Sequence, residues 1–234
     1  MQRKDYRRII GDITALSLIL FFFLGAIHFW CFNQKFYDSE HAKLTLYGKS
    51  ISDHIGISEE DLKDLTAFTL AYLNDKDASL DLQMNVKGTM REVFTDDERA
   101  HMVDVRRLNL AANALCIASL IVFILGTVYY LIRKYPLQDL YRSYVRVLKY
   151  VMLFIAVLGA WILIDFDSFW TMFHHVFFPG NDLWILDLRK DILIMIVPPE
   201  FFNHLVIRIV LNAVFLLFFF YCLFVILSKR KENA

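Results

Sequence analysis

Four long apolar stretches constrain this chain more than any other feature, because each is long enough to cross a bilayer as a helix. A membrane-spanning helix needs about 17–25 predominantly apolar residues, and residues 13–32, 109–132, 147–164 and 205–227 meet that length. The composition agrees, since 57% of the 234 residues are hydrophobic, against about 45–50% apolar residues in soluble domains. We therefore predict an α-helical integral membrane protein with four transmembrane helices.

The first apolar stretch follows several basic residues and could be mistaken for a secretory signal peptide. Its end reads His28-Phe29-Trp30-Cys31-Phe32, without the small residues that a signal peptidase needs. We interpret it as an uncleaved membrane anchor.

The distribution of charge predicts the orientation. Lysine and arginine concentrate at both termini and between the second and third stretches, whereas most acids lie in the other two loops. Because cytoplasmic loops carry the excess of basic residues, we expect a multi-pass protein with both termini in the cytoplasm. The expected division is cytoplasmic 1–12, helix 13–32, head 33–108, helix 109–132, cytoplasmic 133–146, helix 147–164, outer loop 165–204, helix 205–227 and cytoplasmic 228–234. The 25 basic and 25 acidic residues cancel, so no nucleic-acid partner is expected.

Residues 33–108 are too many for a simple connector and predict a small mixed extracytoplasmic head. Ser58 precedes three acids and a helical apolar pattern, which is typical of a capped helix start. Alternation in residues 80–86 suits a short strand. Thr95 with Glu98 three residues later predicts a capping box, and the helix that begins there should run straight into the second span.

His101 lies on this last helix, just before the membrane. Asp97 is four residues earlier and Asp104 three residues later, so either carboxylate could share its face. A carboxylate that holds one imidazole nitrogen makes the other a better general base. The alternative is a solvated histidine at the membrane interface with acidic neighbours.

The outer loop, residues 165–204, is unusually aromatic and contains His174-His175 followed by a turn-like group that includes Asn181 and Asp182. So apolar a loop should pack on the head or enter the outer leaflet, where it would suit a lipid-bearing substrate. The alternative is two histidines in a structural aromatic belt.

Several other chemistries are not supported. Gly48-Lys49-Ser50 lacks the first glycine of a phosphate-binding loop, and neither HExxH nor GxSxG occurs. His101, His174 and His175 have no recognised zinc-ligand spacing. We expect no metal and no cofactor.

Three sequence blocks are similar to those of a known family, the lipoprotein intramolecular transacylases, which are small four-span bacterial membrane proteins. The blocks are 94–105 (FTDDERAHMVDV), 173–184 (FHHVFFPGNDLW) and 194–202 (IMIVPPEFF). The resemblance covers nearly the whole chain, and the family's second histidine corresponds to His174.

The resemblance implies an enzyme of the Gram-positive cell membrane that modifies diacylglyceryl lipoproteins. The sn-2 acyl chain would move from the glyceryl group to the α-amino group of the same N-terminal cysteine, with membrane lipid around the substrate. His101, oriented by Asp104 or Asp97, would be the general base, and His174 would stabilise the oxyanion or protonate the leaving oxygen. The matched block adds Asn181, Asp182 and Trp184 as supporting residues, and leaves the role of His175 open.

Two other functions stay open at this point. The first is a non-catalytic envelope protein whose head binds a partner. The second is an intermolecular acyltransferase or lipid hydrolase that uses the same histidines. The latter would change the mass of the lipoprotein, whereas intramolecular transfer yields an isomer.

Overall fold

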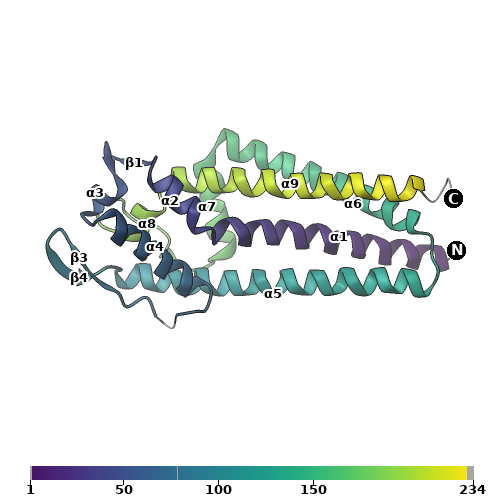
Figure 1. Ribbon diagram of the computed structural model, residues 1–234, viewed down its shortest axis with the longest axis horizontal. Coiled ribbons are helices and arrows are strands. Elements are labelled where there is room, and N and C mark those ends of the chain that lie inside the picture. The colour runs from purple at the N-terminus through teal and green to yellow at the C-terminus, as the bar shows by residue number, and fades with distance from the viewer. Residues whose placement is uncertain (1, 78, 231–234) are drawn as a thin grey trace. The chain divides into compact units, whose positions relative to one another are not determined.

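The computed structural model describes residues 2–77 and 79–230, and the chain divides into two compact units. The membrane unit comprises Met1–His28, Ala112–Phe166 and Arg208–Ala234, and the head unit comprises Phe29–Ala111 and Asp167–Ile207. The elements are α1 (Gln2–Cys31), α2 (Gln34–His41), β1 (Thr45–Leu46), β2 (Lys49–Ser50), α3 (Ile51–Ile55), α4 (Glu59–Leu73), β3 (Gln83–Val86), β4 (Thr89–Glu92), α5 (Asp96–Ile132), α6 (Leu137–Ile164), α7 (Phe166–Phe177), α8 (Ile192–Ile196) and α9 (Pro199–Arg230); all but β2 are labelled in Figure 1. The C-terminal tail beyond Arg230, part of the predicted segment 228–234, lies outside the described residues.

Four helices, α1, α5, α6 and α9, are long and apolar enough to cross a membrane, which confirms the predicted number. Each extends beyond the apolar stretch that identified it. The 37 residues of α5 span about 56 Å at 1.5 Å per residue, nearly twice the hydrocarbon thickness of about 30 Å. The predicted continuation of the helix at Asp96 into the second span is therefore observed. The start of α1 and the end of α9 lie at the same end of the membrane unit (Figure 1).

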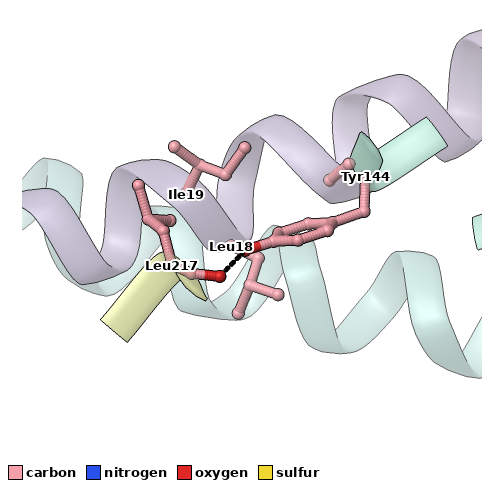
Figure 2. Packing of buried hydrophobic residues seen from close by; sticks show 5 residues of the cluster. Leu18, Ile19, Tyr144 and Leu217 are labelled. Carbon is pink, nitrogen blue, oxygen red and sulfur yellow. Dashed lines mark hydrogen bonds between the residues drawn. The ribbon is translucent and has the colours of Figure 1, made fainter. Parts of the chain in front are cut away.

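The membrane unit has a small buried core to which α1, α6 and α9 contribute. Leu18, Ile19, Tyr144 and Leu217 are all at most 3% exposed. Figure 2 shows the Tyr144 hydroxyl donating to the Leu217 carbonyl, at 2.7 Å. This bond satisfies the one polar group of the cluster, which would otherwise be costly to bury.

α1 and α5 approach closely at Gly126. A Cβ atom at this position would lie 2.0 Å from Oγ1 of Thr14 and 3.0 Å from its Cβ. Small residues at helix contacts let the backbones of membrane helices come together, so Gly126 sets the spacing of this pair.

In the head unit, α4 begins as predicted. The Ser58 hydroxyl accepts from the Asp61 amide at 3.0 Å, and the Asp61 carboxylate accepts from the Ser58 amide at 3.3 Å, which together form a capping box.

Two short antiparallel hairpins complete the head. β1 pairs with β2, and β3 pairs with β4. Both turns have positive φ at each central residue, Tyr47-Gly48 and Lys87-Gly88, which is the type I′ pattern that matches strand twist. The strand predicted for 80–86 is observed from Gln83 onward, and the β1–β2 hairpin was not predicted.

The aromatic segment after α6 contains α7 and α8, with an irregular stretch at 178–191 between them. From Asp167 onward it belongs to the head unit, which agrees with the first of its two expected positions, packed on the head or inserted in the outer leaflet. α9 begins at Pro199, before the apolar stretch that starts at 205. A proline is well placed in the first turn of a helix because its missing N–H would have no helical partner there.

Candidate active site

The first turn of α5 is fixed by a buried carboxylate. Glu98 is fully buried, and its Oε2 accepts from the Thr95 amide at 2.6 Å, which confirms the predicted capping box. Its Oε1 accepts from the Leu193 amide, also at 2.6 Å. Glu98 therefore joins the start of α5 to α8. The local half of this arrangement was predicted from the sequence; the bond to Leu193, which is 95 residues away in the chain, was not.

His101 lies one turn after Glu98 and is 7% exposed. Its ring packs edge-on against Phe178, with centroids 5.2 Å apart, and its centroid is 6.0 Å from that of His174. Its Nδ1 atom is buried and has no hydrogen-bond partner among residues 2–77 and 79–230. Buried polar atoms without partners are rare, and they mark places that a ligand can complete.

His174 is 5% exposed and sits near the end of α7. Its Nδ1 lies 2.8 Å from the carbonyl oxygen of Trp170, one turn earlier. Because a carbonyl only accepts, Nδ1 must carry the proton and donate it, which leaves the lone pair on Nε2. Burial lowers the pKa of His174; the Trp170 carbonyl partly offsets this, and nearby His175 lowers it further.

Trp184 closes one side of His174. The two rings stack with centroids 4.6 Å apart and an interplanar angle of 25°. The indole Nε1 is buried, and in the described part of the chain it has no hydrogen-bond partner. We call His101, His174, Phe178 and Trp184 the paired-histidine site. The site contains two buried nitrogens without a hydrogen-bond partner in the described structure, Nδ1 of His101 and Nε1 of Trp184. The indole nitrogen can only donate.

The turn between α7 and Trp184 is anchored to α5. The Asn181 amide donates to Oδ2 of Asp104 at 3.2 Å, and the Asn181 side-chain oxygen accepts from the Leu183 amide at 3.3 Å. Gly180 has φ of +89°, which favours glycine. Asn181 thus supports the site by holding this turn in place.

The carboxylates expected beside His101 are arranged differently. Asp104 bonds to Asn181 and pairs with Arg107 at 3.3 Å, and no hydrogen bond joins it to His101 in the described structure. Asp97 is exposed on the first turn of α5. Helical spacing allowed both contacts, but the turn from α7 supplies the partner that Asp104 takes.

The two remaining predicted positions lie at the edge of the site. His175 is exposed and meets Trp184 edge-on at 5.5 Å. Asp182 is exposed, and its backbone carbonyl accepts from the Ile185 amide at 3.0 Å. Within the described residues, no three His, Cys, Asp or Glu side chains are grouped as metal ligands.

Two further histidine contacts link elements of the head unit, and neither was predicted. His204 Nδ1 lies 2.6 Å from the buried Glu40 carboxylate, and His41 Nε2 lies 2.8 Å from the Ile196 carbonyl. These contacts join α2 to the start of α9 and to α8. No local pattern reveals them, because the partners are more than 150 residues apart in the chain.

The fold and the site together define a multi-pass membrane protein whose head unit holds two buried histidines among aromatic side chains. A family model for the lipoprotein intramolecular transacylase Lit matches residues 13–202. The chain belongs to this family, and it is therefore an acyltransferase that carries out intramolecular acyl transfer on lipoproteins.

Solved structures of the membrane-integral lipoprotein intramolecular transacylase Lit from Bacillus cereus share the fold. One has a TM-score of 0.82 at 23% identity, covering 99% of this chain and 100% of that chain. A histidine-to-alanine variant of the same protein gives a TM-score of 0.79 at 22% identity, covering 99% and 98%. A histidine-to-arginine variant gives 0.75 at 23% identity, covering 99% and 96%. No curated protein matches the sequence.

Proposed function

We propose that the paired-histidine site moves the sn-2 acyl chain of a diacylglyceryl lipoprotein to the α-amino group of its N-terminal cysteine. The observation that carries this assignment is the 6.0 Å separation of two buried imidazoles, one of which has a fixed tautomer. At that separation both rings can border the same reacting ester.

The substrate supplies much of the catalytic advantage. Donor ester and acceptor amine belong to one molecule, so the site has only to hold the bent conformation that brings them together. Transfer from an ester to an amide is downhill and needs no energy source. The protein must then move one proton and stabilise a tetrahedral oxyanion.

His174 is the better general base in this arrangement. Its Nε2 has a lone pair, and it would take the proton from the attacking amine as the new N–C bond forms. The imidazolium that results is stabilised by the Trp170 carbonyl and by the face of Trp184. Both effects are strongest once the ring is charged, so they act on the transition state more than on the resting site.

His101 would then stabilise the oxyanion of the tetrahedral intermediate. An N–H of this ring, together with the unpartnered Trp184 indole N–H, would donate to the oxyanion. When the C–O bond breaks, the proton held by His174 passes to the departing glyceryl oxygen. The net change is one N–C bond formed, one C–O bond broken and one proton moved from nitrogen to oxygen.

This assignment reverses the roles expected from spacing, where His101 was the base. The reason is the hydrogen-bond partner of each imidazole. The Trp170 carbonyl fixes the tautomer of His174, whereas no carboxylate is hydrogen-bonded to His101 in the described structure. Asp104 acts through Asn181 as a positioning residue.

We further propose that the head unit faces the extracytoplasmic side and that both chain termini are cytoplasmic. The acyl chains of the substrate would then stay in the outer leaflet while its cysteine enters the aromatic site. The distribution of basic residues supports this orientation.

The test is tandem mass spectrometry of the N-terminal lipopeptide of a reporter lipoprotein, made in a host that produces only diacyl lipoproteins. The chain should yield an N-acylated cysteine at unchanged parent mass. His174→Ala and His101→Ala should each abolish the product, because general acid–base groups contribute roughly 10²–10⁴-fold.

The matched control is His175→Ala, which removes the exposed neighbour and should keep most of the activity. A change in parent mass would indicate an intermolecular donor or hydrolysis instead. Unmodified diacylglyceryl-cysteine in all samples, with expression confirmed, would favour the non-catalytic alternative.

A further inference from the structure

A cavity lies in the head unit, and none of its lining residues belongs to the paired-histidine site. Its volume is about 650 Å³, within the range of about 300–1,000 Å³ that is typical of small-molecule sites. Five basic side chains line it, and no acidic side chain does: Lys49, Lys87, Arg91, Arg189 and Lys190. We call it the basic cavity.

The basic cavity combines this charge with an apolar floor. Ile55 of α3 and Ile192 and Met195 of α8 line it, at 2%, 1% and 6% exposure. The cations come from β2, from the β3–β4 turn, from β4 and from the segment before α8. Four separate parts of the chain therefore deliver positive charge to one concave space.

The stem of Lys87 packs against the protein, while the residue as a whole is exposed. Its amide donates to the Gly56 carbonyl at 2.9 Å, and its side chain packs over Gly56 so closely that a Cβ there would lie 2.3 Å from Cγ of Lys87. Gly56 ends α3 in the left-handed conformation, with φ of +86°. The absence of a side chain at Gly56 thus makes room for the stem of a cation.

The charge of the cavity is only partly balanced by the protein. Arg189 forms a two-pronged pair with Asp187, with distances from 2.7 to 3.2 Å, and Lys190 lies 3.9 Å from Asp191. Lys49, Lys87 and Arg91 have no ion-pair partner in the described part of the chain. Like charges gathered in one concave site repel one another and attract counter-ions, so an anion would stabilise this arrangement.

We propose that the basic cavity binds a compact phosphate-bearing anion. Lysine and arginine would contact the phosphate oxygens, and the isoleucine and methionine floor would accept the carbon skeleton next to the phosphate. The source is either the headgroup of an anionic lipid or a soluble phosphate compound. A cavity of about 650 Å³ with an apolar floor fits a compact ligand better than an extended acidic peptide. The site is independent of acyl transfer.

The test uses the full-length chain in neutral detergent and a phosphate-free buffer. Inorganic pyrophosphate represents the soluble source and dihexanoyl phosphatidylglycerol the lipid source; each is titrated by calorimetry. An aspartate-rich peptide tests the alternative. The variant is Lys87→Gln with Arg91→Gln, and the control with the same change of charge is Lys63→Gln with Lys76→Gln, two exposed lysines that do not line the cavity.

We expect saturable binding of at least one phosphate probe, weakened about tenfold or more in the cavity variant because two charge-assisted contacts are lost. The dissociation constant of the control variant should stay within about twofold of the unaltered chain, since its charge changes lie outside the cavity and are screened by salt. Tighter binding of pyrophosphate would identify a soluble source, and tighter binding of phosphatidylglycerol a lipid source.

Three results would overturn the proposal: no saturable binding of either phosphate probe, equal weakening in the cavity and control variants, or binding of the acidic peptide alone. His174→Ala should bind the phosphate probe as the unaltered chain does. Loss of acyl transfer therefore cannot be mistaken for loss of this site.

Discussion

The surroundings of His174 have opposing effects on its pKa. Burial disfavours the imidazolium, whereas the Trp170 carbonyl and the stacked face of Trp184 favour it. On balance the pKa of His174 is lowered, so the ring is neutral at rest, and the Trp170 carbonyl and the Trp184 face reduce the cost of protonating it. A general base that must release its proton again in the same cycle needs both properties.

The first prediction concerns the titration of this ring. Because burial lowers the pKa of His174 below its usual value of 6.5, the ring should be neutral at pH 7, with the proton on Nδ1. A long-range ¹H–¹⁵N correlation spectrum, assigned with His174→Gln, should show this tautomer and a midpoint below that value. By linkage, the neutral ring contributes stability that is lost as the pH falls through 6.5 toward the lowered pKa. An Nε2–H tautomer, or a midpoint above 6.5, would contradict the proposed base.

A second prediction concerns Trp184. Trp184→Leu removes the aromatic face that stabilises the His174 imidazolium, an interaction of about 0.5–2 kcal/mol. We expect kcat to fall by more than tenfold, since 1.4 kcal/mol corresponds to one decade and the variant also loses the indole N–H proposed to donate to the oxyanion. Trp184→Phe loses the same N–H but keeps an aromatic face, so it should retain about tenfold more of the rate than Trp184→Leu. Equal losses of rate in both variants would show that the aromatic face does not stabilise the His174 imidazolium.

At the scale of elements, local signals in the sequence predicted the capped starts of α4 and α5 but neither the first hairpin nor the starts of the other long helices. The helix cap at Ser58 and the capping box at Thr95 were found because a cap is encoded within four residues. The β1–β2 hairpin was missed because its turn is Tyr47-Gly48 rather than the stronger Asn-Gly or Asp-Gly signal. α7 was missed although Phe166, Phe169, Trp170, Phe173 and Phe177 recur with the helical period, because these aromatic residues were interpreted together as part of an interfacial belt.

The contact of α1 with α5 gives the third prediction. Gly126→Ala would place a methyl group against the hydroxyl of Thr14 and 3.0 Å from its Cβ, so Thr14 must leave its bond to the Ile10 carbonyl or the two helices must move apart, at a cost of about 1–3 kcal/mol. We expect a lower midpoint of thermal unfolding in detergent. Gly159→Ala is the matched control, since nothing lies within 4 Å of its added Cβ, and alanine should be neutral or slightly stabilising there. Equal midpoints for the two variants would mean that the helices have room to separate.

At the scale of the whole molecule, composition and apolar length were sufficient for the fold class, but not for the geometry of the site. His101 and His174 stood out by their neighbours and by family blocks, yet nothing local indicates that rings 73 positions apart approach to 6.0 Å. The same limit explains why Asp104 was expected to bind His101 and instead binds Asn181. Contacts between distant segments depend on how α5, α7 and α8 pack, which no short pattern contains.

The fourth prediction tests the orientation of the chain. In a variant whose three cysteines are replaced by alanine, single cysteines are introduced as Lys63→Cys in the head unit and Pro136→Cys between α5 and α6, both at exposed positions. Because basic residues flank the α5–α6 connection, it should be cytoplasmic. A membrane-impermeant maleimide added to intact cells should label Lys63→Cys only, and permeabilised cells should show both. Labelling of Pro136→Cys alone in intact cells would invert the topology. The paired-histidine site would then face the cytoplasm, away from any lipoprotein held in the outer leaflet.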